Sequence, residues 1–263
     1  MKYALVTGAA GGMGKACADR LLEEGFFVFA LDILPLPEKE RLVFIKTDLT
    51  NAESIQNAYA AVSKLTPSLH AIFHFAGVYM LNSLLEIPHQ DVEKIFSINV
   101  MGATLVNSAF FPLLTSGSRI IITTSELAPL DPLPFTGIYA VTKAALDKYA
   151  YSLRMELQLK DIHVSVLRAG AVDTGMLGVS TRLLDTFVTN TTLYTVSAKR
   201  FKKIVETVEA RRISPKALSN KAVKILKRRR PRFSYSINRN PLLLMLNLLP
   251  HSWQFLIIRL ILK

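Results

Sequence analysis

The chain has 263 residues, of which 50% are hydrophobic, and these amounts suit one large folded domain. Its single cysteine, Cys17, excludes an intrachain disulfide and fits a reducing, cytoplasmic compartment. The net charge of +12 is uneven: residues 1–189 carry 15 Lys/Arg and 18 Asp/Glu, whereas residues 190–263 carry 17 Lys/Arg and 2 Asp/Glu. An anionic partner is therefore indicated for the C-terminal part and not for the rest.

Along the chain, short apolar runs alternate with longer segments of helical periodicity. The first run reads as a buried strand from residue 1, so we expect no signal or transit peptide. Further strands are predicted at residues 26–31, 42–47, 71–75, 119–124 and 164–167, and helices at residues 15–24, 51–65, 92–114 and 138–159. Because the strands lack polar alternation, the pattern predicts an α/β, Rossmann-like doubly wound parallel sheet that binds its ligands at the carboxyl ends of the strands.

A glycine-rich turn follows the first strand and precedes the first helix. It reads Thr7-Gly8-Ala9-Ala10-Gly11-Gly12-Met13-Gly14. Gly8 and Gly12 permit a tight turn and a close approach of the backbone to phosphate, and Gly14 lets the helix pack against the strand. The helix N-terminus then directs amide donors at a pyrophosphate. The motif, with Met13 inside it, predicts a dinucleotide site.

Two aspartates end the second and third strands. Asp32 is placed to accept hydrogen bonds from both adenosine ribose hydroxyls and to repel a 2′-phosphate, and Ile33 occupies a position where a basic residue would favour NADP. Asp32 and Ile33 together predict NAD (NADH) as cofactor, with NADP disfavoured. The alternative for Asp32 is a solvated turn residue. Asp48 is predicted either to contact the adenine or to cap the next helix.

A phenol and an ammonium lie one turn apart on the helix predicted at residues 138–159. Tyr139 and Lys143, at i and i+4, share a helix face, and the alternative is a surface pair. A neighbouring ammonium and a positive nicotinamide ring both lower the pKa of a phenol, so Tyr139 is the predicted general acid/base. Ser125 is predicted to orient the substrate oxygen, or else to be a turn residue. Asn99 is predicted to support a water-linked proton relay, or else to be structural.

With these residues the chain resembles the short-chain dehydrogenase/reductase family, from residue 1 to about residue 176. The resemblance implies a catalytic tetrad of Asn99, Ser125, Tyr139 and Lys143, and a homodimer or homotetramer. It also implies cofactor contacts by Tyr139 and Lys143 and, besides the glycine turn and the aspartates, by Leu49, Ala76, Gly77, Gly170, Val172 and Thr174. Two positions depart from the family pattern, since His74-Phe75 replaces two asparagines and Ala169 replaces a proline. These departures bear on cofactor affinity more than on chemistry.

The C-terminal third is predicted to form the substrate pocket. We place a short-chain dehydrogenase/reductase domain at residues 1–214, with a substrate-covering segment at about 175–214, and a basic amphipathic extension at residues 215–263. The covering segment is rich in apolar residues, which either line a pocket for a bulky substrate or only pack the segment on the body. They are Met176, Leu177, Leu183, Leu184, Phe187, Leu193, Tyr194 and Phe201.

The extension combines a basic cluster at residues 221–232 with two short apolar helices at residues 242–249 and 255–262. Polar residues interrupt the apolar stretch, so a membrane-spanning helix is not predicted. Peripheral binding to an anionic membrane is one interpretation, and a subunit interface or a cover over the pocket is the other. Nucleic acid is not an expected partner, because few aromatic residues accompany the basic cluster.

Together these patterns predict an NAD-dependent oxidoreductase that interconverts a secondary alcohol and a ketone on a bulky hydrophobic substrate, with a hydroxysteroid as the leading candidate. The alternatives are a reductase of 3-oxoacyl thioesters or other lipid carbonyls, and a cofactor-binding redox sensor on the same fold. The expected location is cytoplasmic or at a membrane periphery.

Overall fold

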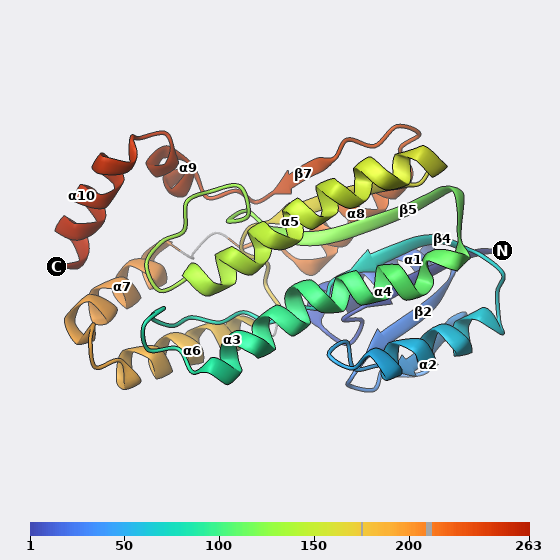
Figure 1. Cartoon of the computed structure of the whole chain (residues 1–263), viewed down its shortest axis with the longest axis horizontal. Coiled ribbons are helices and arrows are strands. Elements are labelled where there is room, and N and C mark those ends of the chain that lie inside the picture. Colours follow the sequence, from blue (N-terminus) through green and yellow to red (C-terminus); the bar gives the residue numbers. More distant parts are fainter. Residues whose placement is uncertain (175, 209–211) are drawn as a thin grey trace.

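The computed structural model describes residues 1–174, 176–208 and 212–263, with the backbone alone at residues 176–181 and 208. Within them, one sheet has the strand order β3-β2-β1-β4-β5-β6-β7, and every neighbouring pair is parallel (Figure 1). The strands are β1 (Lys2–Thr7), β2 (Phe26–Asp32), β3 (Leu42–Lys46), β4 (Leu69–His74), β5 (Leu114–Ser125), β6 (His163–Ala169) and β7 (Ser234–Ile237). The predicted doubly wound α/β fold is confirmed.

Helices connect the strands and continue beyond the last of them. The α-helices are α1 (Gly12–Glu23), α2 (Ala52–Ser63), α3 (His89–Phe96), α4 (Gly102–Phe110), α5 (Gly137–Leu157), α6 (Met176–Asn190), α7 (Thr195–Val208), α8 (Pro215–Leu226), α9 (Pro241–Asn247) and α10 (His251–Leu262). Short helical segments are the π-helix η1 (Ser97–Met101) and the 3-10 helices η2 (Phe111–Leu113) and η3 (Gln158–Lys160).

The helices bury the sheet on both faces, which is why the central segments of its inner strands are apolar. On one face, α2, α4 and α5 pack Val62, Phe110 and Leu146 against the strands. On the other face, α1 and α8 contribute Leu21 and Leu218. Burial of one such side chain stabilises the fold by about 1.5–3 kcal/mol, so the two apolar layers are the main source of stability.

The continuous helical stretch His89–Leu113, which joins α3, η1, α4 and η2, is long and apolar enough to cross a membrane by length and composition. In this fold its Val106 and Phe110 belong to the core cluster under the sheet. The uniform helix predicted at residues 92–114 is wrong in two respects. A π-turn interrupts the helical stretch at Ser97–Met101, and Leu114 already belongs to β5. Nothing in the local apolar pattern of the sequence indicates that interruption.

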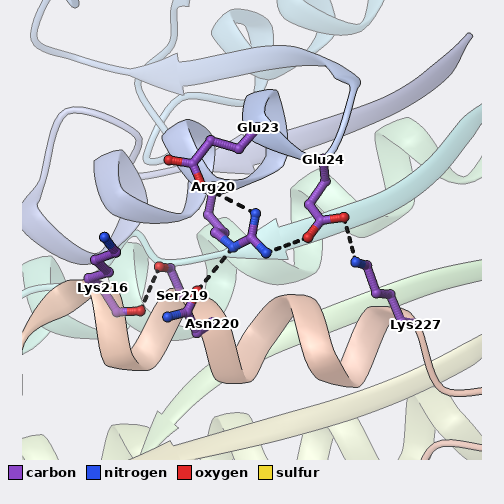
Figure 2. A network of polar contacts seen from close by, with 7 residues as sticks. All are labelled: Arg20, Glu23, Glu24, Lys216, Ser219, Asn220 and Lys227. Carbon is purple, nitrogen blue, oxygen red and sulfur yellow. Dashed lines mark hydrogen bonds and ion pairs between the residues drawn. The ribbon is translucent and has the colours of Figure 1, made fainter.

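Residues beyond 214 contribute to the layered body. Helix α8 lies along α1, and a polar network fastens the two helices (Figure 2). Arg20 donates to Asn220 at 3.0 Å and pairs with Glu24, which also pairs with Lys227. These cations hold the pKa of the Glu24 carboxyl below its usual range, with the hydrogen bond from Lys227 as the largest cause. The boundary placed between residues 214 and 215 thus immediately precedes a helix of the body.

Strand β7 divides the predicted extension into two parts. The basic cluster precedes β7, and there Arg154 donates to the Pro231 carbonyl at 2.9 Å while the Val166 amide donates to Phe233 at 2.7 Å. Helices α9 and α10 follow β7, so they lie beyond the opposite, carboxyl edge of the sheet (Figure 1). The cluster and the apolar helices therefore do not form one continuous surface along the chain.

Candidate functional site

The glycine turn follows β1, which is the neighbour of β4 in the sheet. The helices that follow these two strands lie on opposite faces of the sheet, α1 on one and α4 on the other. Gly8 has a φ of +68°, and a Cβ there would meet the Ala76 backbone nitrogen at 2.5 Å. A Cβ on Gly14 would overlap the Gly8 carbonyl. Helix α1 begins directly at Gly12, three residues before its predicted start, so its free amides face this crevice. The arrangement fits a pyrophosphate.

The turn also meets the segment after β6. A Cβ on Gly12 would lie 2.9 Å from the Cβ of Thr174, so only a glycine lets the two segments approach this closely. Met13 and Val172 line the same cavity as Thr174. The Val172 carbonyl accepts a hydrogen bond from the Thr174 amide at 2.8 Å. The predicted phosphate and nicotinamide contacts are thus adjacent. Gly175, where the substrate-covering segment was placed to begin, lies outside the described residues, as do the side chains of Met176 and Leu177.

Asp32 is the last residue of β2, and two backbone amides hold its carboxylate in place. Ala10 donates to Oδ2 at 2.8 Å and Leu34 donates to Oδ1 at 3.0 Å. A carboxylate oxygen accepts more than one hydrogen bond, so both oxygens can still accept from ribose hydroxyls. Ile33 beside it is exposed. The carboxylate is thus placed to contact an adenosine ribose.

Asp48 is exposed and does not cap a helix. Its Oδ1 accepts from the Thr50 amide at 2.8 Å, whereas the cap of α2 is Asn51, which accepts from the Ser54 amide at 3.1 Å. The helix-cap alternative for Asp48 is therefore wrong, and the adenine contact stays a prediction. Leu49 is buried, and the close approach of Gly102 to its Cβ fixes this loop against α4.

The structure brings Ser125, Tyr139 and Lys143 together at the carboxyl end of β5. Ser125 is the last residue of that strand, and its hydroxyl is hydrogen-bonded to the Tyr139 hydroxyl. Tyr139 and Lys143 lie on α5, with the ammonium 5.6 Å from the centre of the phenol ring. The aromatic ring of Tyr79 packs edge-on against Tyr139, with 4.8 Å between ring centroids. The phenol is thus positioned from three sides.

Burial has the largest effect on the pKa values of Tyr139 and Lys143 in the ligand-free protein. It raises the pKa of Tyr139 to about 12, although the hydrogen bond to Ser125 lowers it, and it lowers the pKa of Lys143 to about 8. The sequence pattern predicted a lowered pKa for Tyr139, whereas the pKa in the ligand-free structure is raised. The reason is that a low-dielectric surrounding disfavours both the phenolate and the ammonium. A positive cofactor ring is the remaining contribution that could reverse the direction for Tyr139.

Asn99 lies inside the π-turn η1, where its buried side chain clamps the loop after β4. Its Oδ1 accepts from the Val78 amide at 2.8 Å, and its Nδ2 donates to the Val78 carbonyl at 2.9 Å and to Thr142 at 3.1 Å. Gly77 lies beside this clamp, since a Cβ there would be 3.2 Å from Asn99 Oδ1 and 3.3 Å from Lys143 Nζ. Asn99 is thus adjacent to Lys143, as a relay requires, and its relay role stays a prediction.

The two departures from the family pattern have distinct surroundings. His74 is buried, with Nε2 2.9 Å from Asn107 Oδ1, and burial lowers its pKa to about 4, so the ring is neutral at pH 7. Asn107 in turn donates to the Tyr149 hydroxyl at 3.2 Å, so this network fastens β4 to α4 and α5. Ala169 ends β6, and Gly170 follows at the point where the Asn238 carbonyl crosses so closely that a Cβ would overlap it.

A cavity of about 740 Å3 extends from these groups towards the C-terminal helices. Tyr139, Ser125 and Gly170 lie at its inner end, and its outer walls are largely apolar. Of the predicted substrate-covering residues, Leu184 and Phe201 line the cavity, and Phe187 is buried beside them, whereas Leu193 is exposed. The cavity walls contributed by α9 and α10 are Leu242, Leu243, Met245, Leu246, Leu249, Ile257, Ile258, Ile261 and Leu262.

Tyr79 and Glu126 are among the cavity residues that sequence reasoning did not find. Tyr79 follows the Ala76-Gly77 pair and carries no motif of its own. Glu126 follows Ser125, and its Oε2 accepts from the Asn240 amide at 2.6 Å, which joins the catalytic strand to the start of α9. Burial raises the pKa of the Glu126 carboxyl, partly offset by that hydrogen bond and by Arg239. Its position directly after Ser125 was the available signal.

Comparison with known proteins finds relatives of this chain by sequence and by fold. A family model described as short chain dehydrogenase matches residues 2–182. The NADPH-dependent 1-acyldihydroxyacetone phosphate reductase of Schizosaccharomyces pombe is 31% identical over 66% of this chain and 60% of its own length. Estradiol 17-beta-dehydrogenase 2 of Mus musculus is 32% identical over 67% of this chain and 50% of its own length. The chain therefore matches only half to three fifths of these relatives.

A third relative matches over nearly the whole chain. The 3-ketodihydrosphingosine reductase of Bacteroides thetaiotaomicron is 25% identical over 95% of this chain and 91% of its own length. Among solved structures, a short chain dehydrogenase family protein of Francisella tularensis has a TM-score of 0.76 at 24% identity, covering 90% of this chain and 97% of that one. A short chain dehydrogenase of Burkholderia cenocepacia in complex with NADP has a TM-score of 0.71 at 22% identity, covering 90% and 96%. These two likenesses show the fold.

Proposed function

Because the chain belongs to the short-chain dehydrogenase family, an oxidoreductase family that uses nicotinamide cofactors, we propose that it transfers a hydride between NAD and a bulky apolar secondary alcohol or ketone. The observation that carries the proposal is the cavity of about 740 Å3, with Tyr139 and Ser125 at its inner end and largely apolar walls beyond them. Part of the cavity is lined by the predicted cofactor contacts Met13, Val172 and Thr174, and its apolar remainder suits a substrate with one polar oxygen on a large hydrocarbon body.

The proposed chemistry divides among four side chains. The nicotinamide, when bound, exchanges a hydride with the substrate carbon. Tyr139 donates its hydroxyl proton to the ketone oxygen in reduction and removes the alcohol proton in oxidation. Ser125 donates a hydrogen bond to the same oxygen and stabilises its developing negative charge. Lys143 favours the phenolate by its charge and holds ribose hydroxyls, and Asn99 holds the loop and helix that surround Lys143.

Asp32 supports NAD rather than NADP in this proposal. The two backbone amides hold the carboxylate at the end of β2, and a 2′-phosphate there would place two anions in contact. The Schizosaccharomyces pombe relative is NADPH-dependent by name, so the preference requires its own test. We expect kcat/KM with NADH to exceed that with NADPH by tenfold or more, equivalent to at least about 1.4 kcal/mol, and Asp32→Ser to remove most of this difference. Equal use of both cofactors by the wild-type protein would refute the argument.

Two substrate classes fit the cavity. A hydroxysteroid is the leading candidate, supported by the size and apolar walls of the cavity and by the estradiol-dehydrogenase relative. A long-chain lipid ketone is the second, because the relative named 3-ketodihydrosphingosine reductase matches over nearly the whole chain, which includes α9 and α10. Open-chain and ring substrates differ in how they use a pocket of one shape, so kinetics can separate them.

The experiment is a turnover panel at the absorbance of reduced nicotinamide, with oxosteroids, long-chain 3-ketolipids and 3-oxoacyl thioesters, each run with NADH and NADPH. Turnover of an oxosteroid supports the leading candidate, and turnover restricted to the open-chain ketones selects the second. Tight NADH binding without turnover of any apolar ketone would refute the proposed activity and favour a cofactor-binding sensor.

A further inference from the structure

Helices α9 and α10 form a hairpin that polar side chains fasten to the body, while its apolar side chains divide between the cavity wall and the outer surface. The loop residue Asp131 holds the hairpin: its amide donates to Asn247 Oδ1 at 2.6 Å, and its carboxylate accepts from Gln254 at 3.2 Å and lies 3.2 Å from His251. Gln254 is buried, and it also donates to the Leu249 carbonyl at 3.0 Å. Three of the polar residues that interrupt the apolar sequence, Asn247, His251 and Gln254, thus anchor the hairpin.

The outer surface of this hairpin is strongly apolar. Six large side chains, together called the apolar tip here, each expose at least 60% of their surface: Leu242, Met245, Leu248, Trp253, Phe255 and Leu260. Single exposed apolar residues are ordinary on soluble proteins, but a cluster on two adjacent short helices marks an interaction surface. The tip lies at one end of the molecule, beyond the carboxyl edge of the sheet (Figure 1).

The surface around the apolar tip is basic. Residues 212–263 contain no Asp or Glu, and Arg239, Arg259 and Lys263 flank or lie on the two helices as exposed cations. Helix α7 packs against α10 and exposes Lys199 and Lys203. Apolar side chains with tryptophan and phenylalanine among them, bordered by Lys and Arg, match the interface between headgroups and acyl chains of an anionic bilayer.

The helices that carry the apolar tip also form part of the cavity wall. Leu242 and Met245 line the cavity and are also exposed, which places them at its mouth within the apolar tip. We propose that α9 and α10 dock the protein on an anionic lipid bilayer, so that the cavity opens into the acyl-chain region. Docking itself does not depend on the reaction, whereas delivery of substrate from the bilayer through this mouth rests on the proposed function.

The chain supplies its own probe for the test, because Trp253 is its single tryptophan and lies in the apolar tip. Full-length protein is mixed, without cofactor or substrate, with vesicles of phosphatidylcholine alone or with phosphatidylserine added. We expect flotation with the anionic vesicles and a shift of the tryptophan emission to shorter wavelength, both weakened by salt. Absence of flotation and of the shift at low salt would overturn the proposal.

Matched variants locate the contact. Leu248→Ser with Leu260→Ser keeps Trp253 and leaves the cavity walls unchanged, and it should weaken partitioning at least about tenfold, because both side chains lose apolar burial in the bilayer. Leu65→Ser with Leu159→Ser removes comparably exposed leucines near the opposite, amino edge of the sheet and should leave partitioning unchanged. Arg259→Glu with Lys263→Glu should abolish the preference for anionic vesicles.

Other outcomes are equally decisive. Equal flotation of the tip variant and the wild type would place the contact elsewhere and overturn the proposal. A dimer in solution that dissociates in the tip variant, without vesicle binding by the wild type, would show that a second copy covers this face, and would also overturn it. Because vesicle binding is measured without substrate, a failure of docking is distinguishable from a failure of the proposed reaction.

Discussion

At the scale of single residues, the catalytic pair is arranged at a cost to stability. Lys143 is almost fully buried, and its ammonium lies beside an aromatic ring rather than a carboxylate in the ligand-free protein. Tyr139 is half-buried and faces the cavity, with its hydroxyl bonded to Ser125. Groups placed this way do not improve the packing of the core, and their burial is consistent with the proposed role in proton transfer.

Removal of the phenol hydroxyl tests that role. Tyr139→Phe retains the ring packing against Tyr79 but loses the proton donor. We expect kcat to fall by about 10³-fold, within the range of general acid–base catalysis, while NADH affinity measured by fluorescence titration stays unchanged. Residual turnover close to that of the wild type would refute the assignment, and Tyr151→Phe, an exposed tyrosine on the same helix, serves as the control.

The buried ammonium predicts a pH-dependent stability difference. Burial lowers the pKa of Lys143 from 10.5 to about 8, so the folded state is destabilised at neutral pH by up to about 3 kcal/mol relative to a neutral side chain. Lys143→Met should therefore raise the Tm by several degrees at pH 7 while abolishing turnover. Between about pH 8 and pH 10.5 the unfolded chain binds more protons at this position than the folded protein, so the wild type gains stability as pH rises and the difference closes. Thermal unfolding of both proteins across this range measures it, and a constant difference would contradict the pKa argument.

At the scale of elements, one carboxylate fastens the turn between α6 and α7 to the loop after β4. Glu86 accepts from the Thr191 hydroxyl at 2.6 Å, from the Thr192 amide at 2.7 Å and from the Leu193 amide at 3.0 Å. These hydrogen bonds, the one from Thr191 first, lower the pKa of Glu86 to about 2. Helices α6 and α7 carry the cavity residues Leu184 and Phe201, so Glu86 holds one wall of the pocket in place.

Loss of this fastening should affect substrate binding and not cofactor binding. Glu86→Ala is expected to raise KM for a bulky ketone severalfold with little change in KM for NADH, measured by steady-state kinetics. Glu53→Ala, in the first turn of α2, removes an exposed carboxylate elsewhere and is the control. Because the pKa of Glu86 in the folded protein is lowered from 4.5 to about 2, its stabilising contribution is complete above the unfolded pKa and is lost as pH falls from there towards about 2. No loosening is therefore expected above about pH 5. Equal KM values in both variants would show that the fastening is dispensable.

At the scale of the whole molecule, the C-terminal 49 residues perform two different structural tasks. Helix α8 buries Leu218 and Ile225 against the face that α1 occupies, and β7 pairs with β6 from Val166 to Ala169. Helices α9 and α10 instead lie outside the sheet and close the cavity. Truncation at different points should separate these tasks.

Deletion after Asn240 should leave a folded protein that binds NADH but turns over a bulky ketone at least about tenfold less well, because an apolar wall of the pocket is lost. Deletion after Ser214 should abolish soluble expression, since several buried apolar side chains at about 1.5–3 kcal/mol each exceed a large part of a typical folding free energy of about 5–15 kcal/mol. Circular dichroism, NADH titration and turnover measure both truncations. A cooperative unfolding transition in the shorter protein would show that residues 1–214 fold alone.

Features encoded within a few neighbouring residues were predictable from the sequence. The apolar runs indicated six of the strands, the glycine spacing indicated the turn before α1, and the i, i+4 spacing placed Tyr139 and Lys143 on one helix face. Strand β7 was missed because its four residues are only partly buried at the sheet edge and follow a basic cluster. The π-turn at Asn99 was missed because no local pattern indicates it, and the contacts of its central side chain are with Val78 and Thr142, which lie 21 and 43 positions away.

By itself, the sequence determined the fold class, the family and the identity of the residues that carry the proposed chemistry, because backbone periodicity and short motifs express local preferences and local geometry. Only the tertiary structure decided that α8 belongs to the body, that Glu86 holds the pocket wall and that Asp131 anchors the hairpin of α9 and α10. Each of these depends on partners more than 100 positions apart, such as Glu86 with Thr191 and Asp131 with Gln254. Such pairings form only when packing brings distant segments together, and no local pattern in the chain records them.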